Sequence, residues 1–241
     1  MVSISDLSIA IYADGADLDT IAARAKDPLI KGFTTNPTLM RKSGVQDYEL
    51  FAKDALVLVG DRSISFEVFA DDFPTMEKQA RRIASWGKNV SVKIPITNTK
   101  GESATSLIGT LSAEGVSVNV TAIMTEAQVE AVAAALSADT SAIVSVFAGR
   151  IADTGRDPVP VMQRCKDILR GKPKAQLLWA SPREVLNLFQ ADAVGCEIIT
   201  MTDDLLKKLG GTGKDLDVFS LETVKMFFDD ASSAGYDIAA D

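Results

Sequence analysis

The chain has 241 residues, 46% hydrophobic and 24% charged, with 25 basic and 33 acidic residues and a formal net charge of −8. This acidic balance without basic clusters argues against a nucleic-acid partner, because binding to phosphate backbones needs clustered lysine and arginine. The sequence contains no histidine, which excludes a Ser-His-Asp triad and a histidine-ligated zinc site.

Short runs rich in β-branched and aromatic residues recur along the chain, and amphipathic segments with helical spacing lie between them. The strand candidates, in order, are SIAIYAD (8–14), GFTTN (32–36), SISFEVF (63–69), NVSVKIPI (89–96), VSVNVTAI (116–123), AIVSVFAG (142–149), AQLLWAS (175–181) and EIITMT (197–202). Helical patterns span 75–87, 105–115, 125–139 and 159–169. Eight such units without a linker predict one α/β domain over residues 1–241, a (β/α)8 TIM barrel, with a doubly wound sheet as the alternative.

The segment LETVKMFFDDASSAG (221–235) predicts one extra helix after the eighth unit. Its apolar residues Val224, Phe227 and Phe228 would either cover the helix's own barrel or contact a neighbouring copy of the chain. The preceding GGTGKD (210–215) resembles a phosphate-binding loop, but lysine and aspartate stand where that motif needs glycine and serine or threonine. We interpret it as a flexible turn.

The N-terminus has no basic segment followed by an apolar run, and no apolar stretch approaches the roughly 20 residues that span a membrane. We therefore expect a cytoplasmic protein without a membrane partner. The two cysteines, Cys165 and Cys196, match no metal-ligand spacing and are interpreted as structural thiols, which fits a reducing compartment.

The strand at 89–96 carries a lysine inside an apolar run. Side chains alternate faces along a strand, so Lys93 opposes Val92 and Ile94. The same alternation separates Glu67, Asn119, Thr121, Ser145 and Phe147 from the apolar neighbours that would pack under helices. The polar face is therefore predicted to point into the barrel. Alternation also predicts that Trp179 shares the inward face with Ser181, either as packing filler or as a residue that shapes a pocket.

Several polar residues fall late in their strands, namely Asp14, Asn36, Glu67, Lys93, Asn119, Thr121 and Ser181. In barrel enzymes the carboxyl ends of the strands carry the chemistry, so these residues are expected to converge on one rim. A plainer interpretation exists for two of them. Asn36 before Pro37 and Ser181 before Pro182 also fit helix N-caps with proline at the first helical position.

A lysine inside a barrel is costly to keep charged, and burial favours its neutral, nucleophilic amine. Such an amine forms a Schiff base with a carbonyl compound, and the iminium then accepts electrons as a carbon–carbon bond breaks. The reaction also needs proton acceptors, and without histidine the inward carboxylates Asp14 and Glu67 must serve. The alternative is that Lys93 only forms an ion pair with one of them.

Six ordered motifs carry a resemblance to a known family: GFTTNPTLM, SFEVFADD, VSVKIPITNTKG, VNVTAIMT, SVFAGRIADTGRDP and LLWASPRE. Together they resemble the short form of the transaldolase family, which includes the fructose-6-phosphate aldolases. The resemblance covers all eight predicted strands in the same order. It implies a class I aldolase mechanism on sugar phosphates with no metal and no cofactor. It also implies a homo-oligomer, because short members often form pentamers or decamers.

The resemblance further implies a role for each candidate residue. Lys93 forms the Schiff base, Asp14 takes the proton of the C4 hydroxyl, and Glu67 relays protons through a water held by Thr121. Asn36 and Asn119 hold the dihydroxyacetone unit, with Ser181 near its end. Arg150 and Arg183 match phosphate ligands, with Ser145 close by, although Arg150 alone also reads as a solvated loop charge.

Two branches of the family remain open. Transaldolases pass dihydroxyacetone from sedoheptulose 7-phosphate or fructose 6-phosphate to an aldose phosphate in the pentose phosphate pathway, whereas the aldolases release it. Glu67 and Phe147, where the aldolases tend to have glutamine and tyrosine, favour transfer. Gly15 and Trp179 depart from the family pattern and leave room for a modified acceptor, such as a sulfonated sugar. A barrel that binds sugar phosphates without turnover is a third hypothesis.

Overall fold

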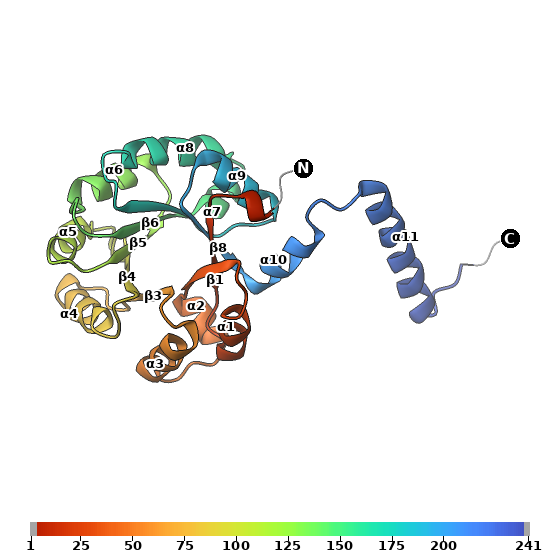
Figure 1. Ribbon diagram of the computed structural model, residues 1–241, viewed down its shortest axis with the longest axis horizontal. Helices are drawn as coiled ribbons and strands as arrows, with labels where there is room; N and C mark the ends of the chain where they lie inside the picture. The colour runs from red at the N-terminus through yellow and green to blue at the C-terminus, as the bar shows by residue number, and fades with distance from the viewer. Residues whose placement is uncertain (1–3, 239–241) are drawn as a thin grey trace.

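The computed structural model describes residues 4–238 and contains a closed barrel of eight parallel strands that follow one another in chain order (Figure 1). The strands are β1 (Ala10–Asp14), β2 (Ile30–Thr34), β3 (Ser63–Glu67), β4 (Val90–Pro95), β5 (Val118–Ile123), β6 (Ala142–Val146), β7 (Ala175–Trp179) and β8 (Ile198–Thr202). The prediction of a (β/α)8 barrel is confirmed. The doubly wound alternative is wrong, because β8 pairs with β1 and leaves no open edge.

The helices form an outer ring around the barrel, except for the last one, which extends away from it (Figure 1). They are α1 (Leu18–Arg24), α2 (Pro37–Lys42), α3 (Tyr48–Val59), α4 (Phe73–Ala84), α5 (Thr105–Ala113), α6 (Glu126–Ala135), α7 (Ala148–Ala152), α8 (Pro158–Leu169), α9 (Leu186–Val194), α10 (Asp203–Lys208) and α11 (Leu216–Ser233), with 3-10 turns η1 (Ile4–Asp6) and η2 (Leu209–Gly211). Side-chain caps start several of them. Asp17, Asp47 and Asp72 each accept a hydrogen bond from the backbone N–H three residues later.

The strand side chains divide into two apolar clusters. The larger lies between the sheet and the helices, and the smaller consists of Tyr12, Ile143, Leu178, Ala180 and Ile198. The smaller cluster fills the barrel below its polar mouth, because Tyr12 and Ile143 precede the inward residues of β1 and β6 by two positions. Gly32 makes room for this cluster, since a Cβ there would lie 2.4 Å from the ring of Tyr12.

Strand β7 corrects one prediction. In the register of β6 and β7, Val146 pairs with Trp179 and Ser145 pairs with Leu178. Paired residues of neighbouring strands share a face, so Trp179 points outward into the helix layer, where it is fully buried. Its expected inward position is therefore wrong, and Trp179 does not shape the barrel mouth. The alternation fails because the chain leaves the extended conformation at Ser181, whose φ is 56°.

The two cysteines lie in different elements, Cys165 in α8 and Cys196 in the segment between α9 and β8. Cys165 and Cys196 are both free and buried. Burial raises the pKa of each thiol to about 12, so both remain protonated at neutral pH. Protonated, buried thiols are poor nucleophiles, which supports the structural interpretation.

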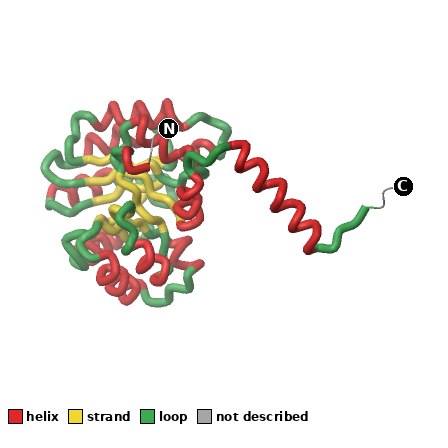
Figure 2. The backbone as a smooth tube through the Cα atoms, turned by 45° about the vertical axis from the view of Figure 1, so that its right-hand side comes forward, coloured by secondary structure: helices red, strands yellow, loops and turns green. Residues whose placement is uncertain are grey.

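Helix α11 extends away from the barrel (Figures 1 and 2). None of its residues is buried, so the alternative that it covers its own barrel is wrong. Its N-cap is Asp215, whose side chain accepts from the backbone N–H groups of Asp217 and Val218. The last residue of the segment that resembles a phosphate loop (210–215) is therefore a helix N-cap. Within residues 4–238, no helix is long and apolar enough to cross a membrane.

Candidate active site

The carboxyl ends of the strands surround a cavity of about 450 Å³. Its lining consists of Asp14, Thr34, Asn36, Pro37, Thr38, Leu39, Glu67, Lys93, Asn119, Thr121, Ala122, Met124, Ser145, Phe147, Arg150, Leu178, Ala180, Ser181 and Thr200. Every residue singled out from the sequence as a site candidate lines this cavity, with the exception of Arg183. The cavity has the position at which barrel enzymes hold their substrates.

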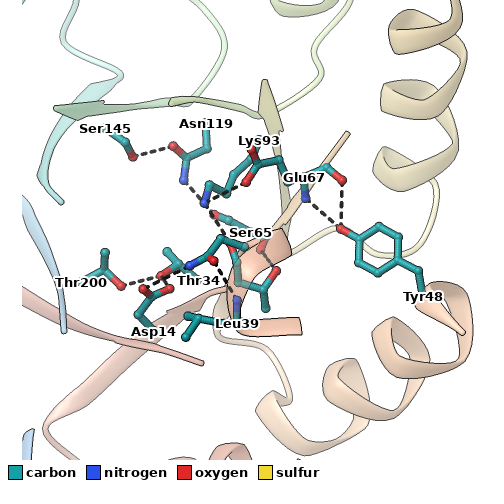
Figure 3. A network of polar contacts seen from close by, with 12 residues as sticks. Asp14, Thr34, Leu39, Tyr48, Ser65, Glu67, Lys93, Asn119, Ser145 and Thr200 are labelled. Carbon is teal, nitrogen blue, oxygen red and sulfur yellow. Dashed lines mark hydrogen bonds and ion pairs between the residues drawn. The ribbon is translucent and has the colours of Figure 1, made fainter. Parts of the chain in front are cut away.

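Lys93 lies at the centre of the polar wall. The register aligns its Cα with Glu67 of β3 on one side and with Asn119 of β5 on the other. The side chain is buried, with 7% of the residue exposed, and its Nζ lies 3.3 Å from Oε2 of Glu67 (Figure 3). Nζ also donates a hydrogen bond of 2.8 Å to the carbonyl oxygen of Thr35. The amine therefore has a carboxylate within proton-transfer reach.

Asp14, the last residue of β1, is the second carboxylate of the cavity. Thr34 donates to its Oδ1 at 2.7 Å, and Asn36 donates to its Oδ2 at 3.5 Å. Burial raises the pKa of Asp14 above its ordinary value, and the charge of Lys93 and these two hydrogen bonds oppose that rise. Thr34 also lies 2.5 Å from the hydroxyl of Thr200, which must donate to it when Asp14 is ionised.

Asn119 is held on both sides of its amide. Its Nδ2 donates to Oγ of Ser65 at 3.0 Å, and its Oδ1 accepts from Oγ of Ser145 at 2.6 Å (Figure 3). All three side chains are buried. Because both ends of the amide have fixed partners, the orientation of Asn119 beside Lys93 is defined by neighbouring strands.

Thr121 carries a buried hydroxyl that has no hydrogen-bond partner within the part of the chain that the structure describes. It lies at the cavity wall, where β5 departs from regular strand geometry. The next residue, Ala122, has a φ of 61°, and the pairing of β5 with β6 shifts between Val120 and Ile123. An unpartnered buried hydroxyl facing a polar cavity is suited to holding a water molecule or a substrate hydroxyl.

Asn36 and Ser181 show different outcomes for the N-cap interpretation. Asn36 is the N-cap of α2, accepting from the N–H of Leu39 at 3.0 Å, and it also lines the cavity. Ser181 is not a cap, because α9 begins only at Leu186, so the cap alternative is wrong for this residue. Its loop packs closely on Gly149, where a Cβ would lie 1.5 Å from the carbonyl oxygen of Ser181.

The two predicted phosphate ligands differ in their surroundings. Arg150 lines the cavity, and its guanidinium lies 5.6 Å from the centre of the Phe147 ring. Arg183 lies outside the cavity lining and forms an ion pair with Asp153, its Nε donating at 2.9 Å. The structure therefore brings Arg150 into the cavity wall, whereas Arg183 stays outside it in an ion pair with Asp153.

Sequence reasoning missed two hydroxyls of the site, those of Thr34 and Thr200. Side-chain alternation along β2 and β8 could have identified both. Thr34 pairs with Asp14 at the end of β2, and Thr200 lies two residues after the inward Ile198 in β8. Polar residues at these inward positions form the hydrogen-bonded row that ends at Asp14.

No metal centre emerges from these groups. Within residues 4–238, no cluster of three or more histidine, cysteine, aspartate or glutamate side chains could hold a metal ion.

Comparison with known proteins decides the family. A model of the transaldolase/fructose-6-phosphate aldolase family matches residues 11–240. The chain belongs to that family. A probable transaldolase of Nitrosopumilus maritimus is 33% identical over 83% of this chain and 86% of its own length. Similar proteins named probable transaldolase occur in Dehalococcoides mccartyi, with 35% identity over 83% of this chain and 89% of the relative, and in Thermoplasma acidophilum, with 32% identity over 83% and 86%. The protein is thus an enzyme of the transaldolase class.

The hydrogen bond from Thr34 makes the titration of Asp14 testable. Replacing Thr34→Val removes a donor that stabilises the ionised carboxylate, so the pKa of Asp14 should rise further above its ordinary value. A ¹³C NMR titration of protein labelled in its aspartate carboxyls measures this directly. Thr34→Ser keeps the hydroxyl and should leave the pKa near that of the wild type. An unchanged or lower pKa in Thr34→Val would contradict the assigned contact.

Proposed function

We propose that this enzyme is a transaldolase that transfers a dihydroxyacetone unit from a ketose phosphate to an aldose phosphate through a Schiff base on Lys93. The donor is sedoheptulose 7-phosphate or fructose 6-phosphate, which corresponds to the pentose phosphate pathway in the cytoplasm. One observation carries the proposal. A buried primary amine lies 3.3 Å from a carboxylate at the mouth of a closed barrel, in a cavity with a second carboxylate and several amide and hydroxyl groups.

The first step joins Lys93 to the donor. Glu67 takes a proton from the ammonium, and the neutral amine attacks the C2 carbonyl carbon of the ketose. The carbinolamine then loses its hydroxyl as water, for which Glu67 returns a proton through a water molecule held by Thr121. Support for this relay comes from the free hydroxyl of Thr121 and the short distance between Lys93 and Glu67.

The second step breaks the bond between C3 and C4. Asp14 accepts the proton of the C4 hydroxyl, the aldehyde leaves, and the electron pair of the bond moves into the iminium to form an enamine on Lys93. The raised pKa of Asp14 suits a proton acceptor, because a more basic carboxylate takes a hydroxyl proton more readily. The enamine then attacks the aldehyde carbon of the acceptor, with Asp14 returning the proton to the new hydroxyl.

The other lining residues bind the substrate in this proposal. Asn36, Asn119, Ser145 and Ser181 hold the hydroxyls of the dihydroxyacetone unit, and Arg150 binds the phosphate at the cavity entrance. Arg183 is a second phosphate ligand only if it exchanges Asp153 for the substrate, because the two form an ion pair in the free protein.

Two residues favour transfer over release of free dihydroxyacetone. Glu67 stands close to the amine as a carboxylate, and Phe147 presents an apolar ring to the cavity. Without a phenol at this position, fewer groups hold a water that could protonate and release the enamine. The alternative is an aldolase of the same family. Trp179 lends no support to a modified acceptor, because it lies outside the cavity.

A coupled assay with fructose 6-phosphate tests transfer. With erythrose 4-phosphate present, the wild type should form sedoheptulose 7-phosphate, and without an acceptor it should release dihydroxyacetone much more slowly. Asp14→Asn should lower kcat by about 10²- to 10⁴-fold, as expected for loss of a general base. The variant Glu67→Gln with Phe147→Tyr should shift the products toward free dihydroxyacetone. Release at the transfer rate by the wild type would favour the aldolase alternative.

We also propose that the enzyme is a homo-oligomer, a pentamer or a decamer, in which α11 packs against another copy of the chain. The helix leaves many apolar side chains exposed, namely Leu216, Val218, Phe219, Leu221, Val224, Met226, Phe227 and Phe228. Burying each such side chain stabilises an interface by about 1.5–3 kcal/mol. An apolar helix none of whose residues is buried is therefore suited to an intersubunit contact.

Sedimentation velocity tests this arrangement. The wild type should sediment as a pentamer or decamer, and Phe227→Asp with Phe228→Asp on α11 should produce smaller species. Val57 on α3 is also exposed, at 83%, so Val57→Asp is a matched control that should leave the assembly unchanged. A monomeric wild type, or an assembly that survives the α11 substitutions, would contradict the proposal.

A further inference from the structure

On the side of β2, the backbone of Glu67 has no paired strand residue, because β2 ends before it reaches Glu67. The pairing of β2 with β3 ends at Thr34 and Ser65, and Thr35 makes the last hydrogen bond, donating to the carbonyl oxygen of Ser65 at 3.2 Å. Beyond this point the chain turns into α2, which begins at Pro37. Successive residues of a strand direct their backbone groups to opposite sides, so Glu67 is the next residue that faces the missing strand.

The hydroxyl of Tyr48 takes the place of that strand. It donates to the carbonyl oxygen of Glu67 at 3.0 Å and accepts from the N–H of Glu67 at 2.8 Å (Figure 3). On the other side of β3, Val68 donates to the carbonyl oxygen of Lys93 at 3.1 Å. The end of β3 is thus fixed to the lysine strand by one neighbour and to α3 by the phenol, which satisfies both backbone groups of Glu67.

The ring of Tyr48 is itself held in place by aromatic packing. It meets Phe66 edge to face at 6.1 Å and Trp86 edge to face at 5.4 Å, and it lies 4.6 Å from Phe69. Tyr48 is also the first residue of α3, whose N-cap is Asp47. Both the ring and its backbone are therefore fixed, so the hydroxyl presents a defined geometry to Glu67.

We propose that Tyr48 is a positioning residue that sets the place of the Glu67 carboxylate relative to the Lys93 amine by clamping the backbone of Glu67. This inference rests on the proposed function, in which Glu67 exchanges protons with Lys93. A displacement of about 1 Å at a reacting group can cost about a hundredfold in rate, so the anchor of a carboxylate 3.3 Å from the amine is important for turnover.

The phenol keeps this role at neutral pH. Burial raises the pKa of Tyr48 well above its ordinary value, and the backbone hydrogen bond to Glu67 opposes the rise only in part. The hydroxyl therefore stays protonated at neutral pH and donates to the Glu67 carbonyl. Tyr48 holds Glu67 without exchanging protons itself.

A double-mutant cycle tests the proposal. Tyr48→Phe should lower kcat roughly ten- to a hundredfold with KM within about twofold of the wild type, because the clamp is lost but the cavity lining is intact. In the background of Glu67→Gln, the same substitution should change kcat by less than about twofold, since the residue through which it acts has already been removed. Equal losses in both backgrounds would show a merely structural role and overturn the inference.

Hydrogen exchange supplies a readout that does not depend on activity. Tyr48→Phe should speed exchange at the amide of Glu67 by at least about tenfold, because its acceptor is gone. Phe51→Leu is the matched control. It lies on the same helix and packs edge to face on Phe66, so it should lower stability while leaving kcat and the Glu67 amide unchanged.

The outcomes separate the two proposals. A wild type without transfer activity defeats the proposed function, while the exchange experiment still tests the clamp. A wild type that is active, a Glu67→Gln variant that is impaired and a Tyr48→Phe variant with normal kcat together defeat the role of Tyr48 alone. Normal exchange at the Glu67 amide in Tyr48→Phe would also contradict the clamp.

Discussion

The pairing of Lys93 with Glu67 is the constraint on which the site depends. An ammonium cannot be buried without compensation, and removing one member of a buried ion pair typically costs about 3–5 kcal/mol. Here the carboxylate and the carbonyl oxygen of Thr35 provide that compensation at 3.3 Å and 2.8 Å. The same contacts make the amine useful, because a base within reach can remove its proton when a carbonyl compound arrives.

Closure of the barrel positions the other polar residues of the site around Lys93 and Glu67. Since each strand pairs with the next, the register aligns one row of inward residues across β3, β4 and β5, and hydrogen bonds join a second row from β1, β2 and β8. The first row carries Lys93 between Glu67 and Asn119, and the second carries Asp14 with two threonines. The smaller apolar cluster fills the barrel interior beneath these rows, so the polar groups meet only at the mouth.

Much of this arrangement could be predicted from alternation of side chains along each strand. The period of two correctly assigned Lys93 to the inward face, because β4 is a regular strand. It failed for Trp179, because the chain departs from extended geometry just after β7. No pattern in the sequence shows that Asp153 engages Arg183, or that Tyr48 reaches Glu67, since these contacts join segments whose relative placement depends on the packing of helices and loops.

Reductive trapping tests the central claim most directly. Fructose 6-phosphate and borohydride should convert the imine to a stable amine, and peptide mass spectrometry should find one reduced dihydroxyacetone adduct on Lys93. Lys93→Arg should give no adduct and no turnover, because a guanidinium stays protonated and cannot form the imine, while its charge can still face Glu67. An unmodified wild type that turns over substrate, or an equal adduct in Lys93→Arg, would contradict the account.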